Sequence, residues 1–327
     1  MTGPEEIASL MRPLAPALLQ GDAQALQTLE LQASDLPFRG LALLAPSQAA
    51  AGGPLPVVLL VQKTSLRGWE VNEESNLSLA AFDPDTGRLE VVPALDDAKG
   101  RAYPPPDLAR PPRPPASAAQ TVMTRAYRFD AARLMAPPAG PGPMQLVALA
   151  YDWVSNSAPV LRSGGGPGRP SSSPAIEPAP ASTPGRLPSY EATRHHPPMP
   201  DAGVAFKFEP LRDGGQALLA SFAKRASASE RLAVPQALAT GSGPRQAVAV
   251  VPVTLALVTL DNARPTVLRW RVPVYGAAPV AEGARIAGQI AIDVGALAPP
   301  PGSPPRMAYL FIGEHVAGPE PLAAQPR

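Results

Sequence analysis

Proline is the feature that most constrains the fold of this chain. The 327 residues include 46 prolines and 27 glycines, together 73 residues. This is roughly twice the share of the two residue types in an ordinary globular protein. Neither residue is tolerated in helix interiors, because proline removes a backbone donor and glycine loses much conformational freedom. The sequence therefore predicts a mainly all-β chain with many turns.

Charge and cysteine content exclude several functional classes. The 28 Lys and Arg nearly balance the 27 Asp and Glu, and no basic stripe is visible, which argues against a nucleic-acid partner. The absence of cysteine excludes disulfides, thiol catalysis and cysteine-bound zinc. No stretch at the start has the pattern of a secretory signal, and the longest apolar run, 247–258, is interrupted by Pro252 and too short to span a bilayer. We expect a cytoplasmic protein without a membrane partner, and the Ala/Pro/Gly/Arg-rich composition suggests a bacterial genome.

Residues 1–35 carry the one convincing helical pattern. Apolar residues recur there at three- and four-residue spacing, which predicts an amphipathic helix packed onto a domain. Pro13 and Pro16 should kink or break this helix, and Asp22 is a candidate N-cap for a second short helix. The apolar stripe consists of Ile7, Leu10, Met11, Leu14 and Leu18.

From residue 36 onward the apolar period changes to two, which is typical of strands. We predict a first β domain at 36–161 and a second at 201–322. In the first, strands are expected at 57–64, 77–83, 89–92, 124–130 and 144–153. In the second, strands are expected at 206–211, 247–261, 266–275, 285–294 and 307–316, and a short helix at 217–222.

Two proline tracts interrupt this pattern. Residues 162–200 contain 10 Pro, 5 Gly and 6 Ser and almost no large apolar side chain, so burial cannot offset the entropy of ordering them. We predict a disordered linker there. Residues 103–115 hold 7 prolines and are expected to form a long loop inside the first domain.

The two β blocks look like copies of each other. Residues 129–154 align without a gap with 292–317, and both segments read strand, aspartate, leucine, proline-rich loop, methionine, apolar strand. The identical pairs include Asp130/Asp293 and Met144/Met307. Together with the strand spacing, the repeat predicts two tandem immunoglobulin-like antiparallel β-sandwich domains. Asp130 and Asp293 should then end equivalent strands.

Two segments resemble metal sites only weakly. The acidic turn that begins at Asp83 lacks the later ligands of a calcium loop, and its Asp-Pro-Asp-Thr-Gly sequence is ordinary hairpin chemistry. His195, His196 and Met199 have side chains that suit copper. Because these three lie in the predicted linker without fixed geometry, a solvated segment is the favoured interpretation, and no cofactor is expected.

The usual signatures of catalysis are missing. No Gly-x-Ser-x-Gly elbow is present, three histidines leave few candidate bases, and the glycine-rich run at 164–168 lacks the Lys-Ser/Thr pair of a phosphate loop. We therefore predict that the protein is not an enzyme.

What remains is chemistry that suits recognition. Arg110 and Arg113 flank a PxxP core of the kind that aromatic grooves accept. Trp69 and Tyr151 are candidate partner-binding aromatics, whereas Trp153 is expected in the core.

The leading hypothesis is a non-catalytic protein-binding or assembly module with duplicated β domains, whose partner is another protein and which also has scope for self-association. Two alternatives stay open. One is a copper-handling accessory protein that uses His195, His196 and Met199, and the other is an enzyme whose site forms between the domains and is not visible as a motif.

Overall fold

The chain folds into two compact, mainly β units. Unit 1 comprises Met1–Phe82 and Glu90–Ser171, and unit 2 comprises Asp83–Leu89 and Ser172–Arg327. The computed structural model describes residues 3–65, 77–93, 121–134, 142–150, 153–163, 196–210, 215–237, 246–259, 265–276, 280–303 and 305–324. The predicted all-β sandwich class is confirmed. Within the described ranges, no helix has the length and apolar character needed to cross a membrane.

The N-terminal segment of unit 1 is helical and is broken where its prolines occur. Asp22 caps the last of its helices, because Asp22 Oδ1 accepts hydrogen bonds from the backbone N–H groups of Gln24 at 2.8 Å and Ala25 at 3.3 Å. Both features were predicted. The helices are α1 (Pro4–Met11), the 3₁₀ turn η1 (Arg12–Leu14), α2 (Ala15–Gln20) and α3 (Ala23–Ser34).

Unit 1 has three layers, with the helices on one face of a three-stranded sheet and a second sheet on the other. The first sheet has the order β1 (Gly40–Leu44), β3 (Pro56–Ser65), β6 (Thr121–Asp130). Along β3, Val58 and Leu60 pack against the helices, whereas Val57, Leu59 and Val61 face the second sheet. Burial on both faces explains why β3 is apolar throughout rather than alternating.

The second sheet of unit 1 has the order β2-β8-β7-β4-β5. One predicted strand, 144–153, is shorter than expected. β7 ends at Leu149, and the chain turns back so that Ala150 N donates to Trp153 O at 2.8 Å. The strands are β2 (Gln48–Ala50), β4 (Ser78–Phe82), β5 (Leu89–Pro93), β7 (Gly142–Leu149) and β8 (Ala158–Ser163).

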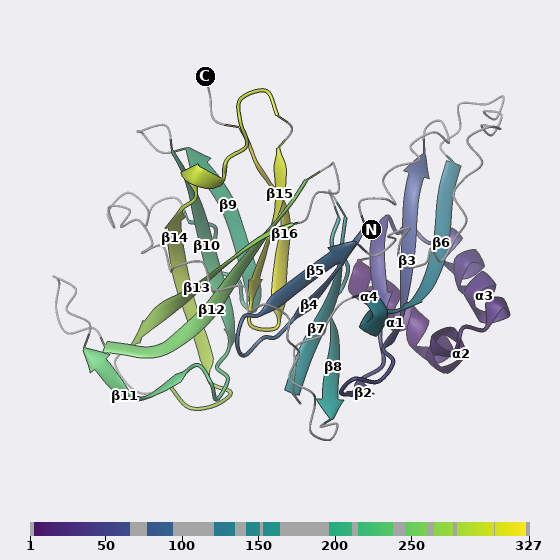
Figure 1. Ribbon diagram of the computed structural model, residues 1–327, viewed down its shortest axis with the longest axis horizontal. Helices are drawn as coiled ribbons and strands as arrows, with labels where there is room; N and C mark the ends of the chain where they lie inside the picture. Colours follow the sequence, from purple (N-terminus) through teal and green to yellow (C-terminus); the bar gives the residue numbers. More distant parts are fainter. Residues whose placement is uncertain are drawn as a thin grey trace. The chain divides into compact units, whose positions relative to one another are not determined.

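Unit 2 is a sandwich of a three-stranded and a five-stranded sheet (Figure 1). The three-stranded sheet is β14 (Arg285–Asp293), β10 (Gln216–Arg225), β9 (Gly203–Pro210). The five-stranded sheet runs β11-β12-β15-β16, with β13 paired to the other side of β12. Its strands are β11 (Arg231–Ala237), β12 (Gln246–Val258), β13 (Thr266–Gly276), β15 (Arg306–Ile312) and β16 (His315–Leu322).

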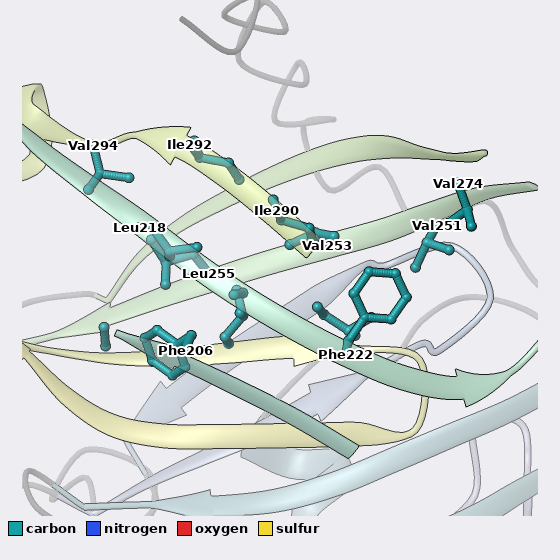
Figure 2. Packing of buried hydrophobic residues seen from close by; sticks show 14 of the residues in the cluster. Phe206, Leu218, Phe222, Val251, Val253, Leu255, Val274, Ile290, Ile292 and Val294 are labelled. Atoms are coloured by element: carbon teal, nitrogen blue, oxygen red, sulfur yellow. The ribbon is translucent and has the colours of Figure 1, made fainter. Parts of the chain in front are cut away.

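The inner faces of the two sheets form the core of unit 2. Phe222 from β10 lies among aliphatic side chains of the facing sheet and of β14 (Figure 2). Pro252 lies in the middle of β12 without disrupting it. The pairing of β12 with β11 stops at Ala249 and its pairing with β15 begins at Val253, so Pro252 falls in the gap between the two neighbours.

Two sequence predictions for unit 2 were wrong. Residues 217–222 form part of strand β10, not a helix, because β10 is the central strand of its sheet and is buried on both faces. An unbroken run of small and apolar residues has no period that distinguishes strand from helix. Residues 307–316 form two strands, because the chain reverses at Gly313, which has a φ of 60°.

Seven strands of each unit share one topology, as the repeat predicted, whereas β2 and β11 have no counterpart in the other unit. In unit 1 the strand order is β1-β3-β6 beside β8-β7-β4-β5, and in unit 2 it is β9-β10-β14 beside β16-β15-β12-β13. Asp130 and Asp293 are the last residues of β6 and β14. In both, Oδ1 accepts from the backbone N–H two residues later, at 3.1 Å from Ala132 and 2.9 Å from Gly295, and a short helical turn follows.

The ends of the predicted 162–200 linker have defined structure. Arg162 and Ser163 are the last residues of β8, so the linker prediction began two residues too early. Residues 196–200 are held by Ser221 Oγ, which donates to Pro197 O at 2.6 Å, and by Arg285 Nη2, which donates to Pro200 O at 3.3 Å. Residues 164–195 and the proline-rich loop 103–115 lie outside the described residues.

Candidate functional site

The residues predicted to bind a partner fall outside the described part of the chain. Trp69, Arg110, Arg113 and Tyr151 are all in this group. Their neighbour Trp153 is half-buried and packs against the core of unit 1, as expected for a structural aromatic.

The predicted copper segment is only partly described. His195 lies outside the described residues, while Met199 is 44% exposed. His196 is half-buried, and its Nδ1 has no hydrogen-bond partner among the described residues. Burial lowers the pKa of His196, as does repulsion from Lys207, against a backbone hydrogen bond to Ala220 and the charge of Glu209. Within the described ranges, no group of three or more His, Asp or Glu side chains is placed to hold a metal ion.

The acidic turn at Asp83 is a hairpin turn, as the sequence favoured. Asp83 Oδ1 accepts from the backbone of Asp85 at 2.9 Å and of Thr86 at 3.1 Å, and Asp83 Oδ2 accepts from Thr86 Oγ1 at 2.7 Å. Gly87 closes the turn with a φ of 71°. Both carboxylate oxygens of Asp83 are therefore engaged in holding the backbone.

Unit 2 contains a buried ion pair between Lys224 and Glu230. Lys224 Nζ lies 2.7 and 2.6 Å from the two carboxylate oxygens of Glu230, and the side chains are 2% and 1% exposed. Glu230 Oε2 also accepts from Ser227 N at 3.0 Å. Lys224 and Glu230 compensate each other's charge, and solvent is excluded from both side chains. The pair therefore fixes the connection between β10 and β11 rather than offering a reactive group.

The feature that sequence reasoning missed is the open edge of strand β13. Within the described strands, β13 pairs with β12 alone, over 11 register positions from Thr266 to Gly276. Among the described residues no strand pairs with its other side, and a strand edge of this kind is the geometry to which an added strand pairs. Pro273 alone does not identify this edge in the sequence, because the central strand β12 also contains a proline, Pro252.

Three other edge strands among the described residues are covered. In unit 1, α3 lies along edge strand β6, and Glu30 Oε1 accepts from the backbone N–H of Ala126 at 2.8 Å. In unit 2, the edges β9 and β16 lie against each other. The strand of unit 1 that corresponds to β13 is β5, which has only 5 residues.

The core beneath β13 is incompletely covered. Leu268, Trp270 and Val272 point inward and pack on the core of unit 2, but each is only partly buried. The inward residues of the neighbouring strand β12, such as Val253 and Leu255, are fully buried. An added strand would cover the three partly buried side chains further and gain the free energy of apolar burial.

The outer face of β13 is basic. Arg269 and Arg271 are exposed and, being two residues apart, lie on the same face as Tyr275, which is 37% exposed. Among the described residues, neither arginine forms an ion pair. Although the residue is exposed, partial desolvation of its guanidinium lowers the pKa of Arg269, and so does the positive charge of Arg88, which belongs to the Asp83–Leu89 part of unit 2.

Comparison with known proteins gives no family. No protein family model and no curated protein matches the chain. Among solved structures, the crystal structure of red sea bream transglutaminase aligns with 94% of this chain at 10% sequence identity and a TM-score of 0.19. The chain spans 34% of the length of that protein. A likeness this distant carries no argument about activity.

Proposed function

We propose that the protein is a non-catalytic protein-binding or assembly module and that the edge of β13 is its recognition surface. The observation that carries this proposal is an 11-residue edge strand whose inward side chains Leu268, Trp270 and Val272 are only partly buried. Main-chain pairing supplies affinity in strand addition, and pockets for alternate side chains supply specificity. A strand that paired with β13 would gain both. A cytoplasmic setting and a bacterial origin remain part of the proposal.

A chain with two similar domains can have this function even if only one of the domains binds the partner. Two similar domains on one chain can engage two sites of a partner and gain avidity. The short β5 of unit 1 offers less edge than β13, so the proposal assigns recognition to unit 2.

Site-specific photocrosslinking tests the proposal. Benzoylphenylalanine placed at Tyr275 in the full chain should give a discrete crosslinked product in an extract of the native host, and the same group at Leu10 should not. Leu10 is a matched control because it is also an exposed apolar residue, on α1. Equal labelling at the two positions, or none at Tyr275, would contradict recognition at β13. Turnover by the purified protein that is lost on a single polar substitution would contradict the non-catalytic assignment.

A further inference from the structure

We infer that the partner segment at the β13 edge is an acidic, extended polypeptide strand. The inference rests on the proposed function and specifies its ligand. Its basis is that Arg269 and Arg271 lie on one face of an open edge strand, exposed and without an ion-pair partner among the described residues.

The spacing of the two arginines matches the period of a paired strand. Side chains at alternate positions of a strand lie on the same face, so carboxylates at every second position of an added strand would lie beside Arg269 and Arg271. Guanidinium groups bind carboxylates through parallel hydrogen bonds, and opposite charges across a strand pair are favourable. The position between the two carboxylates would lie beside Trp270 on the inner face of the sheet, where an apolar side chain is favoured.

The existing neighbours of Arg269 and Arg271 do not neutralise them. On β12, Arg269 lies opposite Thr254 and Arg271 lies opposite Pro252, neither of which carries a charge. The charged neighbour that acts on Arg269 is Arg88, which repels it. An incoming carboxylate would relieve this repulsion, whereas an incoming lysine would add to it.

A second copy of this chain fits the edge less well. If two β13 strands paired antiparallel and centred on Trp270, Arg269 of one copy would lie opposite Arg271 of the other. Like charges directly opposite each other destabilise a strand pair. Arginines on an edge also discourage nonspecific sheet extension, so the same residues would reject a copy of the chain and admit an acidic strand.

The test uses three synthetic ten-residue peptides with the full-length protein. One alternates Glu and Val, one alternates Thr and Val, and one alternates Lys and Val. All three have valine at the inward positions, so they differ only in the side chains that would face the arginines. We expect the Glu peptide to bind about tenfold more tightly than the Thr peptide at low salt, the order expected of two exposed charge pairs. The Lys peptide should bind least.

Two variants assign the preference to the arginines. The double variant Arg269→Glu/Arg271→Glu should reverse the order, so that the Lys peptide binds most tightly. Arg12→Glu in η1 is the matched control, since Arg12 is an exposed arginine of unit 1, and it should keep the wild-type order. Thermal unfolding monitored by circular dichroism would verify that each variant is folded.

Each outcome decides the inference. Equal binding of the three peptides would overturn the acidic preference while leaving edge recognition intact. If none of the three peptides binds, the inference is overturned. Photocrosslinking at Tyr275 then tests the proposed function independently. A single-stranded oligonucleotide that displaced the Glu peptide and bound more tightly would assign the arginines to phosphate and would also overturn it.

Discussion

Lys224 and Glu230 show how one pair of residues can control the stability of unit 2. Each side chain is almost fully buried and has the other as its counter-ion. Removal of one partner leaves a buried charge without compensation. We therefore expect Lys224→Met to lower the free energy of unfolding by about 3–5 kcal/mol.

A double variant distinguishes charge from packing at this position. Lys224→Met/Glu230→Leu removes both charges together, so most of the lost stability should return. Urea denaturation of the wild type, the single variant and the double variant measures the three values. If the double variant is less stable than the single one, the pair contributes chiefly through geometry that apolar side chains cannot replace.

His196 should make stability depend on pH in a narrow range. Burial holds the pKa of its imidazole below the ordinary value of 6.5, so the unfolded chain binds a proton more readily than the folded one. Stability that depends on neutral His196 is complete above pH 6.5 and is lost as the pH falls through the lower, folded-state pKa.

Denaturation at pH 7.5 and 5.5 tests this expectation. The wild type should lose stability between the two conditions, and His196→Gln should lose less, because glutamine does not titrate. A variant with the same loss as the wild type would show that His196 is not the group responsible. Lys207 and Glu209 are the charged residues whose fields act on the ring.

At the scale of elements, the strand prediction succeeded where one face of a strand differs from the other. β14 alternates exposed and buried residues along much of its length, and its predicted range of 285–294 is almost that observed. β10 is buried on both faces, so the alternation that identifies a strand is absent, and the same residues were predicted as a helix.

The edge of β13 could not be predicted from the sequence either, because the pattern of one strand does not show which neighbours it has. The pattern of β13 predicts a strand, and Arg269 and Arg271 flank Trp270 in the sequence. Whether a strand lies at an edge depends on which partners the rest of the chain supplies. The pairing of β12 with β13 on one side and with β11 and β15 on the other is a property of the whole sheet.

Gly318 lies in β16, a strand whose pairing with β15 is irregular. Its φ is 125°, and a Cβ built there would lie 2.5 Å from the backbone oxygen of Ala308, beside the register shift between β15 and β16. Gly318→Ala therefore combines backbone strain with a clash that no side-chain movement relieves. Gly283 is the matched control, since its φ is 74° and nothing lies within 4 Å of its Cβ position.

The two glycine variants separate strain from clash. Gly283→Ala should cost about 1–2 kcal/mol of unfolding free energy from the left-handed backbone alone. Gly318→Ala should cost a further 1–3 kcal/mol or so, as overpacking does. Chemical denaturation gives both values, and equal losses would show that β16 shifts away from Ala308 at little cost.

At the scale of the whole molecule, the strand order that the two units share explains more of the architecture than any single motif. Asp130 and Asp293 end equivalent strands and hold the turns that follow them. The two units differ because unit 1 carries α1 to α3 on one face of its three-stranded sheet, because β2 and β11 lie at different places, and because β13 is longer than β5. The shared topology provides the sandwich, and the differences between the copies determine which edge is open.

The composition of 164–195 predicts where proteases will divide the chain. A segment rich in proline, glycine and serine, with few large apolar side chains, is a preferred site of cleavage because its backbone makes few contacts. Trypsin should cut first after Arg186 or Arg194, since Arg169 precedes proline and is resistant. Mass spectrometry of a short digestion should show one fragment that begins at Met1 and another that ends at Arg327. The variant Arg186→Gln/Arg194→Gln should delay the first cut. Earlier cutting within β3, after Lys63, or within β13, after Arg269 or Arg271, would show that the linker is not the weakest part of the chain.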